Sequence, residues 1–375
     1  MVSARIERPS GRPGGKRAVL RRVPLALGIA AVVFVLVWIL FWAPGTTFGS
    51  AVSDPTDFLT TLLDSITIAG LYFIVASGFT LIFGLMRVVN MAHGSLFLLG
   101  GYFAFGAQTC FVGGTGRPCT AGFISTGSGG LGLLSSQVSL WNWVFPLLIA
   151  TAIVGVVGLL IQQVFLRWNQ GQELRQALIT IAISIIAADL MLAHFGGSPE
   201  GITWPIQLDT ATKFVRVGSI AYSWSRLFIL LVAIGVGVAL WLWLQKTRTG
   251  MVIRAGVDDR QMVSALGVNV QRVFALAFLV GAALAGLGGV MGGTFSSVAP
   301  GIDGNWLLNS LVVVIIGGMG SIWGAAIGSL LYGLITSFSA AYLPSSYVPY
   351  AITFTFVLLA VVLAVRPYGL MGRPA

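Results

Sequence analysis

The sequence predicts an all-α polytopic membrane protein with nine or ten membrane segments. Of its 375 residues, 57% are hydrophobic and 9% are charged, and the mean hydropathy is +0.93. Soluble domains carry about 25% charged residues, so this chain lacks the polar surface that water requires. Its apolar residues also gather in runs of about 20, the length that crosses a bilayer as a helix.

Nine apolar runs carry this prediction. They are 23–42, 64–85, 92–110, 143–166, 176–195, 227–245, 273–297, 306–338 and 347–365. The first exceeds the apolar part of a secretory signal and lacks a good cleavage site after it, so we expect a retained helix. The run 306–338 is too long for one ordinary span, and GGMGS at Gly317 to Ser321 interrupts it. We therefore expect a broken helix with two segments there.

The basic residues predict the orientation. If the N-terminus is cytoplasmic and 306–338 folds back or spans twice, all but four of the 21 Lys and Arg residues face the cytoplasm. The four on the outer side are Arg117, Lys213, Arg216 and Arg226. Because cytoplasmic loops are enriched in Lys and Arg, both termini are expected in the cytoplasm. Arg87, between the second and third runs, adds to the cytoplasmic charge.

This orientation divides the chain into a basic cytoplasmic tail (1–22), a transmembrane domain (23–366) and a short cytoplasmic C-terminal tail (367–375). Long outer loops are expected at 111–141 and 196–225, and a long cytoplasmic loop at 246–272. Cys110 and Cys119 lie in or beside the first outer loop, where a disulfide and two free thiols are both open. The basic residues form no patch with aromatic partners, so no nucleic-acid partner is expected.

The cytoplasmic loop contains the pattern of a short docking helix. Asp258 and Gln261 fit a capping box, and Gly267 fits the left-handed residue that ends a helix. Met262, Val263 and Leu266 would share an apolar face on a helix that is too short to be stable alone in water. We interpret this face as a contact for another protein. A helix resting on lipid headgroups or on its own domain is the alternative.

Small residues recur every four positions along the run 273–297. They are Gly281, Ala285, Gly289 and Gly293. This spacing lets helix backbones approach closely, so we predict a packing face, with a sliding or tilting helix as the alternative.

Two polar interruptions of apolar runs are candidates for a transport path. The break at Gly317, Gly318, Gly320 and Ser321 frees backbone groups that only protein or a water-filled path could satisfy. Helix ends there would suit a zwitterionic solute, the alternative being a plain turn. The second interruption contains Asn90, His93 and Gly94. His93 would either contact the solute or fix the turn.

Enzymatic signatures are lacking in the sequence. There is no phosphate-binding loop, no H-E-x-x-H and no G-x-S-x-G, and the two histidines form no triad with the acids. We therefore expect no catalytic residue, metal site or cofactor in this chain. Asp189, a carboxylate expected within a span, is a candidate either for proton coupling or for an interfacial position.

Four segments resemble, in order and approximate spacing, segments of the branched-chain amino acid ABC-importer permeases. They are GFTLIFGLMRVVNMAHGSLFLLGGY from Gly78, RAGVDDRQMVSALGVNVQRVFALAFLVGAALAGLGGVM from Arg254, GGMGSIWGAAIGSLLYG from Gly317 and VRPYGLMG from Val365. The resemblance covers roughly residues 57–373. The chain looks like the subunit type that carries N-x-A-H-G, here Asn90 to Gly94. Its basic N-terminal extension and the long loop 111–141 exceed what that family usually has.

The resemblance implies an ABC-importer permease-like fold and a transport subunit, not an enzyme, that carries branched-chain amino acids. Its implied partners are a second related permease, two cytoplasmic ATP-binding subunits, an extracytoplasmic solute-binding protein and the bilayer of a bacterial inner membrane. The short cytoplasmic helix would then be the coupling helix. Its ATPase-contacting residues would be Arg254, Asp258, Asp259, Gln261, Met262, Leu266 and Gly267. Urea, short amides or another amino acid are alternative substrates, and a proton-coupled secondary transporter is the alternative mechanism.

Overall fold

The computed structural model describes residues 55–86, 89–111, 119–121, 124–126, 140–169, 171–208, 214–217, 220–258, 260–343 and 346–372. The expected first span 23–42, the N-terminal tail, residues 373–375 of the C-terminal tail, Arg87, Asp209 and Asp259 lie outside these residues, as do the side chains of Cys110 and Cys119.

The described residues are almost all helical. The long helices are α3 (Pro55–Met86), α4 (His93–Phe111), α5 (Leu140–Ile161), α6 (Glu173–Phe195), α7 (Trp224–Lys246), α10 (Val270–Phe295), α11 (Ile302–Gly317), α12 (Ile322–Tyr342) and α13 (Ala351–Val365). The shorter helices are α8 (Arg248–Asp258), α9 (Arg260–Ala265), the π-helix η1 (Gln162–Leu166) and the 3-10 turns η2 (Arg167–Asn169), η3 (Ile206–Leu208) and η4 (Val348–Tyr350). The strands are β1 (Cys119–Ala121), β2 (Ile124–Thr126), β3 (Phe214–Val217) and β4 (Ile220–Ser223), which form two antiparallel hairpins.

The helices confirm the all-α polytopic membrane class. Within the described residues, seven helical segments are long and apolar enough to cross a membrane: 56–84, 143–169, 173–195, 224–246, 270–295, 322–342 and 348–365. Helix α11, with 16 residues, is shorter. The expected broken helix is present, since α11 ends at Gly317 and α12 begins at Ile322. The total of nine or ten segments stays a prediction because 23–42 is outside the described residues.

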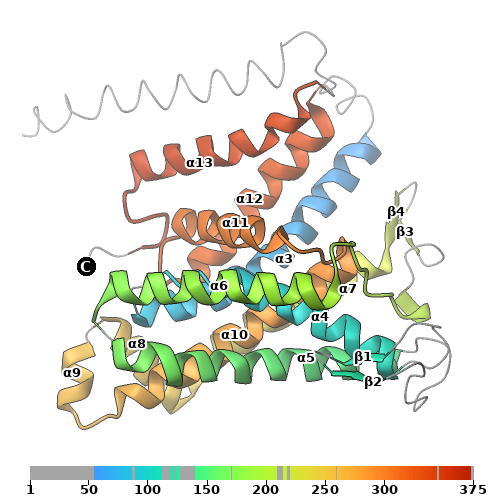
Figure 1. The fold of residues 1–375 in the computed structure, drawn as a ribbon. Coiled ribbons are helices and arrows are strands. Elements are labelled where there is room, and N and C mark those ends of the chain that lie inside the picture. Colours follow the sequence, from blue (N-terminus) through green and yellow to red (C-terminus); the bar gives the residue numbers. More distant parts are fainter. Residues whose placement is uncertain are drawn as a thin grey trace, which may run out of the picture.

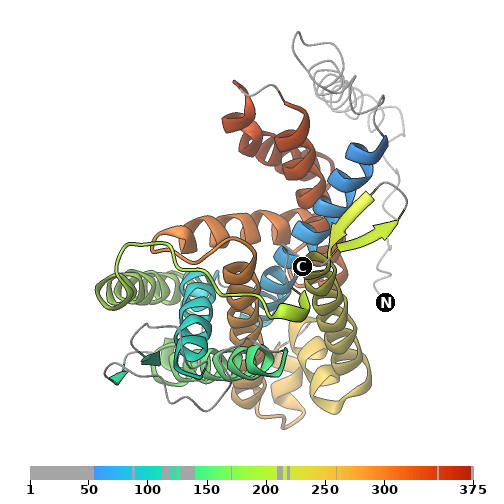
Figure 2. The ribbon, with the colours of Figure 1, turned by 90° about the vertical axis from the view of Figure 1, so that its right-hand side faces the viewer.

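Helices α3 and α10 form the centre of the molecule. Helix α10 packs against α3, α4 and α5, and α3 packs against α12, α7 and α11 as well (Figures 1 and 2). An aromatic stack joins three of these helices. Trp306 of α11 stacks on Tyr72 of α3, with 4.7 Å between ring centroids, and on Phe97 of α4, with 4.4 Å. By contrast, most of α6 and α13 is uncovered by the rest of the described chain.

The small-residue stripe of α10 lies where this helix crosses α3 and α4. A Cβ at Gly281 would meet the carbonyl oxygen of Gly78 and the side chain of Ile82, both in α3. A Cβ at Gly289 would overlap the carbonyl oxygen of Phe97 in α4. Ala285, between them, is fully buried. These backbones lie so close that glycine is required at Gly289.

The two β-hairpins lie at one end of the helices, and α8 and α9 lie at the opposite end (Figure 1). At the hairpin end, the segment after α6 is bonded to the rest of the molecule. Glu200 and Val298 exchange two backbone hydrogen bonds of 2.7 and 2.8 Å. The side-chain amide of Gln108 donates to the carbonyl of Thr203 and accepts from its N–H. The outer loop 196–225 is thus held against α4 and α10 over its first third.

Candidate functional site: a polar seam between α4 and α6

The joint between α3 and α4 is closed by Asn90. Its side-chain oxygen accepts the N–H of Ala92 at 3.1 Å, and its carbonyl accepts the N–H of His93 at 3.2 Å. Asparagine favours such turns because its side chain can bond to backbone two residues on. Asn90 is buried, and its side-chain N–H group has no hydrogen-bond partner among the described residues.

His93 begins α4 and is completely buried. Its Nε2 lies 3.0 Å from the carbonyl oxygen of Val75 in α3, so the tautomer that carries hydrogen on Nε2 donates there. The ring also meets the ring of Phe79 edge-on, at 5.3 Å between centroids. His93 therefore anchors the first turn of α4 to the middle of α3.

Helix α6 faces this joint with a polar stripe. Gln176, Thr180 and Ser184 recur every four residues and so share one helix face. The hydroxyl of Thr180 accepts the N–H of Met91 at 3.2 Å, and the hydroxyl of Ser184 lies 2.8 Å from that of Ser95. Sequence analysis missed this stripe. The four-residue spacing of polar residues within an apolar run was the available signal.

A small cavity of about 10 Å³ lies between the joint and α6. Its polar lining is Asn90, Gln176 and Thr180, and its apolar lining includes Ile82 and Phe278. A space of this size holds about one water molecule. The side-chain carbonyl of Gln176 has no partner among the described residues, although its N–H group donates to the carbonyl of Asn169 at 2.8 Å.

Gln162 is a third buried amide with unpaired atoms. It begins η1, next to Leu166, which lines the cavity. The side chain is completely buried, and neither its oxygen nor its nitrogen has a hydrogen-bond partner among the described residues. Each buried polar group without a partner lowers the stability of the fold by about 1–3 kcal/mol. The unpaired groups of Asn90, Gln162 and Gln176 are therefore destabilising as they stand.

Asp303 extends the polar seam at the start of α11. It is buried, and its carboxylate lies 3.4 Å from the hydroxyl of Ser95. A Cβ at Gly94 would overlap the carbonyl of Asp303, so the first turns of α4 and α11 are in direct contact. Sequence analysis missed Asp303, which lies just before the run 306–338. Asp189, which it did select, is exposed on a different face of α6.

The break between α11 and α12 lies against the C-terminal segment. Gly318 and Gly320 have left-handed φ values of +103° and +84°, and the hydroxyl of Ser321 caps α12 by accepting the N–H of Gly324 at 3.0 Å. The last carbonyls of α11 accept two N–H groups from beyond α13. Leu370 donates to Ile316 and Met371 to Gly317, each at 2.9 Å. Protein thus satisfies these backbone groups, and the VRPYGLMG segment supplies the partners.

The loop 246–272, expected on the cytoplasmic side, forms two helices where one was expected. Asp258 is the last residue of α8, so its backbone is helical and it is not the N-cap that the capping box requires. The side chains of Asp258 and Gln261 lie outside the described residues. Gly267 has a φ of +79°, and its N–H bonds the carbonyl of Ser264 at 3.0 Å, which agrees with the expected helix end. Helix α8 was missed because its composition is too polar to form an apolar run.

Helix α9 exposes part of the expected apolar face. Met262 and Leu266 are 60% and 75% exposed, whereas Val263, expected on the same face, is buried at 5%. Val263 points inward because it lies about 100° around the helix from Met262. In α8, Arg254 donates to the side-chain oxygen of Gln245 at 2.9 Å and so joins this loop to the end of α7.

Among the described residues, no group of three or more His, Cys, Asp or Glu side chains is arranged to hold a metal ion. The seam contains only neutral hydrogen-bonding groups, one carboxylate and apolar walls. Such an arrangement can bind and orient a small polar solute.

Comparison with known proteins adds a family. The family described as "Branched-chain amino acid transport system / permease component" matches residues 61–365. The chain is 29% identical over 330 residues to the high-affinity branched-chain amino acid transport system permease protein LivH of Escherichia coli K12, covering 84% of this chain and 96% of that protein. It is 27% identical over 319 residues to BraD of Pseudomonas aeruginosa, another such permease protein, with the same coverages. It is 25% identical over 316 residues to a probable branched-chain amino acid transport permease of Methanocaldococcus jannaschii, covering 82% of this chain and 90% of that one. No solved structure gives a significant match.

Proposed function

The chain belongs to the branched-chain amino acid transport permease family, and from this membership we propose that it is a membrane-spanning subunit of an ABC importer that carries branched-chain amino acids into the cell. The observation that carries the proposal is the family match along residues 61–365, which includes nearly every described helix. The chain is a transport subunit, and ATP hydrolysis takes place on separate subunits.

The proposed assembly contains a second related permease, two cytoplasmic ATP-binding subunits and an extracytoplasmic binding protein. Helix α9 supports the contact with the ATPase, because it exposes Met262 and Leu266 at the end of the molecule opposite to the β-hairpins (Figure 1). The uncovered faces of α6 and α13 leave room for the second permease and for lipid. In this arrangement both termini are cytoplasmic and the chain resides in the bacterial inner membrane.

The polar seam is the proposed path for the amino acid. A branched-chain amino acid has an ammonium group, a carboxylate and an apolar side chain. Unpaired amide groups of Asn90, Gln162 and Gln176 can meet the charged ends, while Ile82 and Phe278 can meet the side chain. The cavity of about 10 Å³ is far smaller than leucine, so the path is closed in this conformation.

Helix α6 is the proposed moving part. Among the described elements, its main contacts are with α4 and η1, and those with α4 include the hydrogen bonds of Thr180 and Ser184. Hydrogen bonds between polar side chains in a membrane contribute only about 0.6 kcal/mol each on average, so they can exchange for bonds to a solute. By contrast, α10 is in close backbone contact with α3 and α4 at its glycines, and a solute cannot replace these contacts.

Transport by purified protein tests the proposal. The chain is reconstituted in proteoliposomes with its partner subunits, and uptake of labelled leucine is measured with binding protein outside and ATP inside. We expect ATP-dependent uptake that an uncoupler does not reduce. Uptake that needs no ATP and collapses with the proton gradient would establish the secondary transporter, with Asp189 as its first candidate. Competition by urea and short amides in the same assay separates the alternative substrates.

A further inference from the structure

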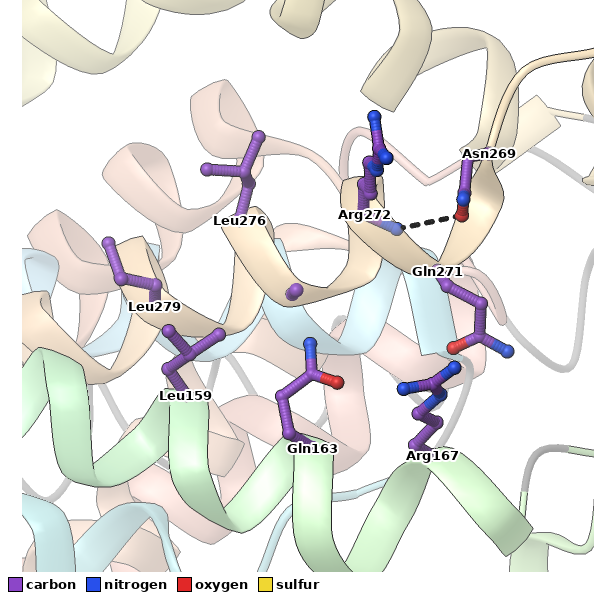
Figure 3. A pocket seen from close by; sticks show the side chains of 9 residues that line it. Leu159, Gln163, Arg167, Asn269, Gln271, Arg272, Leu276 and Leu279 are labelled. Carbon is purple, nitrogen blue, oxygen red and sulfur yellow. Dashed lines mark hydrogen bonds between the residues drawn. The ribbon is translucent and has the colours of Figure 1, made fainter.

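A groove of about 600 Å³ opens between α5 and α10, at the ends of these helices that face the predicted cytoplasmic side (Figure 3). Five polar residues line one part of it: Arg167, Arg272, Gln163, Gln271 and Asn269. Four apolar residues line the rest: Leu159, Ala275, Leu276 and Leu279. The groove is separate from the polar seam.

The polar part of the groove carries two positive charges. Arg167, the first residue of η2, extends toward Gln271 of α10, and Arg272 lies on the first turn of α10 with its side chain directed away from Arg167 (Figure 3). No carboxylate is among the lining residues, and no described acid lies within ion-pairing distance of either guanidinium group. The start of α10 adds the positive end of its helix dipole. An anion is therefore the complementary ligand.

The apolar part of the groove continues along the helices. From Asn269 to Leu279 is ten residues of α10, about 15 Å along the axis, which reaches from the headgroup region into the hydrocarbon. Leu160 and Val164, beside the groove on α5 and η1, are each more than half exposed. The groove thus opens onto a surface that faces lipid. A free anion would fill only the polar part.

Trp168 places the polar part at the membrane surface. Its side chain is largely exposed, and the guanidinium of Arg167 lies 5.6 Å from its ring centroid. Tryptophan is enriched at the headgroup level, where its ring is partly in lipid and its N–H can reach water. This position puts Arg167 at the depth of lipid phosphates.

We propose that this groove binds an anionic phospholipid of the cytoplasmic leaflet. Arg167 holds its phosphate, Arg272 adds positive charge from the other side of the first turn of α10, the amide of Gln163 contacts the glycerol and headgroup oxygens, and one acyl chain lies over Leu159 and Leu279. Basic pockets between membrane helices on the cytoplasmic side are suited to such headgroups. The bound lipid would fill the space between α5 and α10, next to α9.

Lipid binding to the full-length chain tests this inference without any transport assay. Purified protein is exchanged into neutral detergent, and retained lipid is identified by native mass spectrometry. Phosphatidylglycerol, phosphatidylcholine and glycerol 3-phosphate are then added back separately while the thermal unfolding midpoint is measured. We expect retained phosphatidylglycerol and a midpoint that phosphatidylglycerol raises more than phosphatidylcholine does.

Three variants locate the site. The double variant Arg167→Gln/Arg272→Gln should bind phosphatidylglycerol roughly thirtyfold more weakly, because each cation near the surface contributes a factor of about five. Ala275→Trp should also reduce binding, because it fills the apolar part without changing the charge. Arg366→Gln removes an exposed arginine at the end of α13, outside the groove, and should bind like wild type.

Three outcomes would overturn the proposal. If the double variant and wild type bind phosphatidylglycerol equally, the two arginines do not bind the lipid and serve only to orient the chain in the membrane. If glycerol 3-phosphate stabilises the protein as much as the lipid, the site takes a soluble anion. If phosphatidylglycerol protects only chain purified without its partner subunits, a partner covers the groove in the assembly and the lipid is not its occupant.

Discussion

The hydroxyl groups of Ser95 in α4 and Ser184 in α6 lie 2.8 Å apart and join these two helices. Ser95 also lies 3.4 Å from the carboxylate of Asp303, so three helices meet at this hydroxyl. A hydroxyl can donate and accept at once, and it can change partners by rotating. The seam is therefore a place where helices are joined by groups that can also bind a solute.

Thr180 should matter to both stability and transport. Thr180→Val keeps the shape but removes the oxygen that accepts the N–H of Met91, which leaves a partly buried amide without its partner. We expect a loss of about 1 kcal/mol in the free energy of unfolding and a severalfold fall in leucine uptake. Thr180→Ser keeps the hydroxyl and should stay close to wild type in both. If Thr180→Val and Thr180→Ser have equal unfolding free energies and equal uptake, the hydrogen bond between Thr180 and Met91 contributes to neither.

Gln162 should affect stability and transport in opposite directions. Gln162→Met replaces a buried, unpaired amide by an apolar side chain of similar length. We expect the variant to be more stable by about 1–2 kcal/mol, because the desolvated amide is removed, and to transport at least several times more slowly. Thermal unfolding and uptake are measured on the same preparation.

The control for this prediction is Gln207→Met, since Gln207 is exposed on η3. Gln207→Met should change neither the thermal unfolding nor the leucine uptake. A Gln162→Met protein that is destabilised and inactive would instead indicate a structural role for the amide.

Much of the fold follows from the sequence because the bilayer imposes a simple length rule. The apolar runs and the break at Gly317 to Ser321 mark where described helices lie, although α3 begins at Pro55, earlier than its apolar run. Helix α8 could not be found in this way, because its mixed polar and apolar residues form no apolar run. Among its residues whose side chains are described, Ile253 is deeply buried.

The candidate site was predictable only in part. Asn90 and His93 interrupt an apolar run and are conspicuous in the sequence. The partners in this joint come from other helices through tertiary packing: Val75 of α3 pairs with His93, and Thr180 of α6 with the N–H of Met91. In the sequence, Asp303 has the position of a loop residue. In the structure it is buried, and its backbone contacts Gly94. Asp189 is misleading for a geometric reason: five residues after Ser184, it lies about 140° around the helix from the polar stripe.

Leu266 tests the contact proposed for α9. Leu266→Asp puts a charge on a side chain that is 75% exposed, so the fold should tolerate it, while an apolar docking surface should not. We expect ATP-dependent uptake to be abolished and the amount of protein in the membrane to be unchanged. Ser264→Asp adds the same charge at an exposed position on the other side of α9 and should retain most of the uptake. Wild-type transport by Leu266→Asp would remove this helix from the coupling contact.

Gly289 tests whether α10 and α4 are tightly interlocked, and Gly235 of α7 is the control glycine. A Cβ at Gly289 in α10 would overlap the carbonyl oxygen of Phe97, a backbone atom that can move only if α4 moves. Gly289→Ala should therefore cost about 3 kcal/mol, the upper part of the range for overpacked cores. In the described part of the chain, Gly235 in α7 has no atom within 4 Å of its added Cβ, so Gly235→Ala should be neutral or stabilising by about 0.5–1 kcal/mol from helix propensity. The unfolding free energies of the two variants in the same detergent give the comparison. If Gly289→Ala is tolerated as well as Gly235→Ala, α4 and α10 are not interlocked. There is then no physical reason to propose that α6 moves while the crossing of α4 and α10 stays fixed.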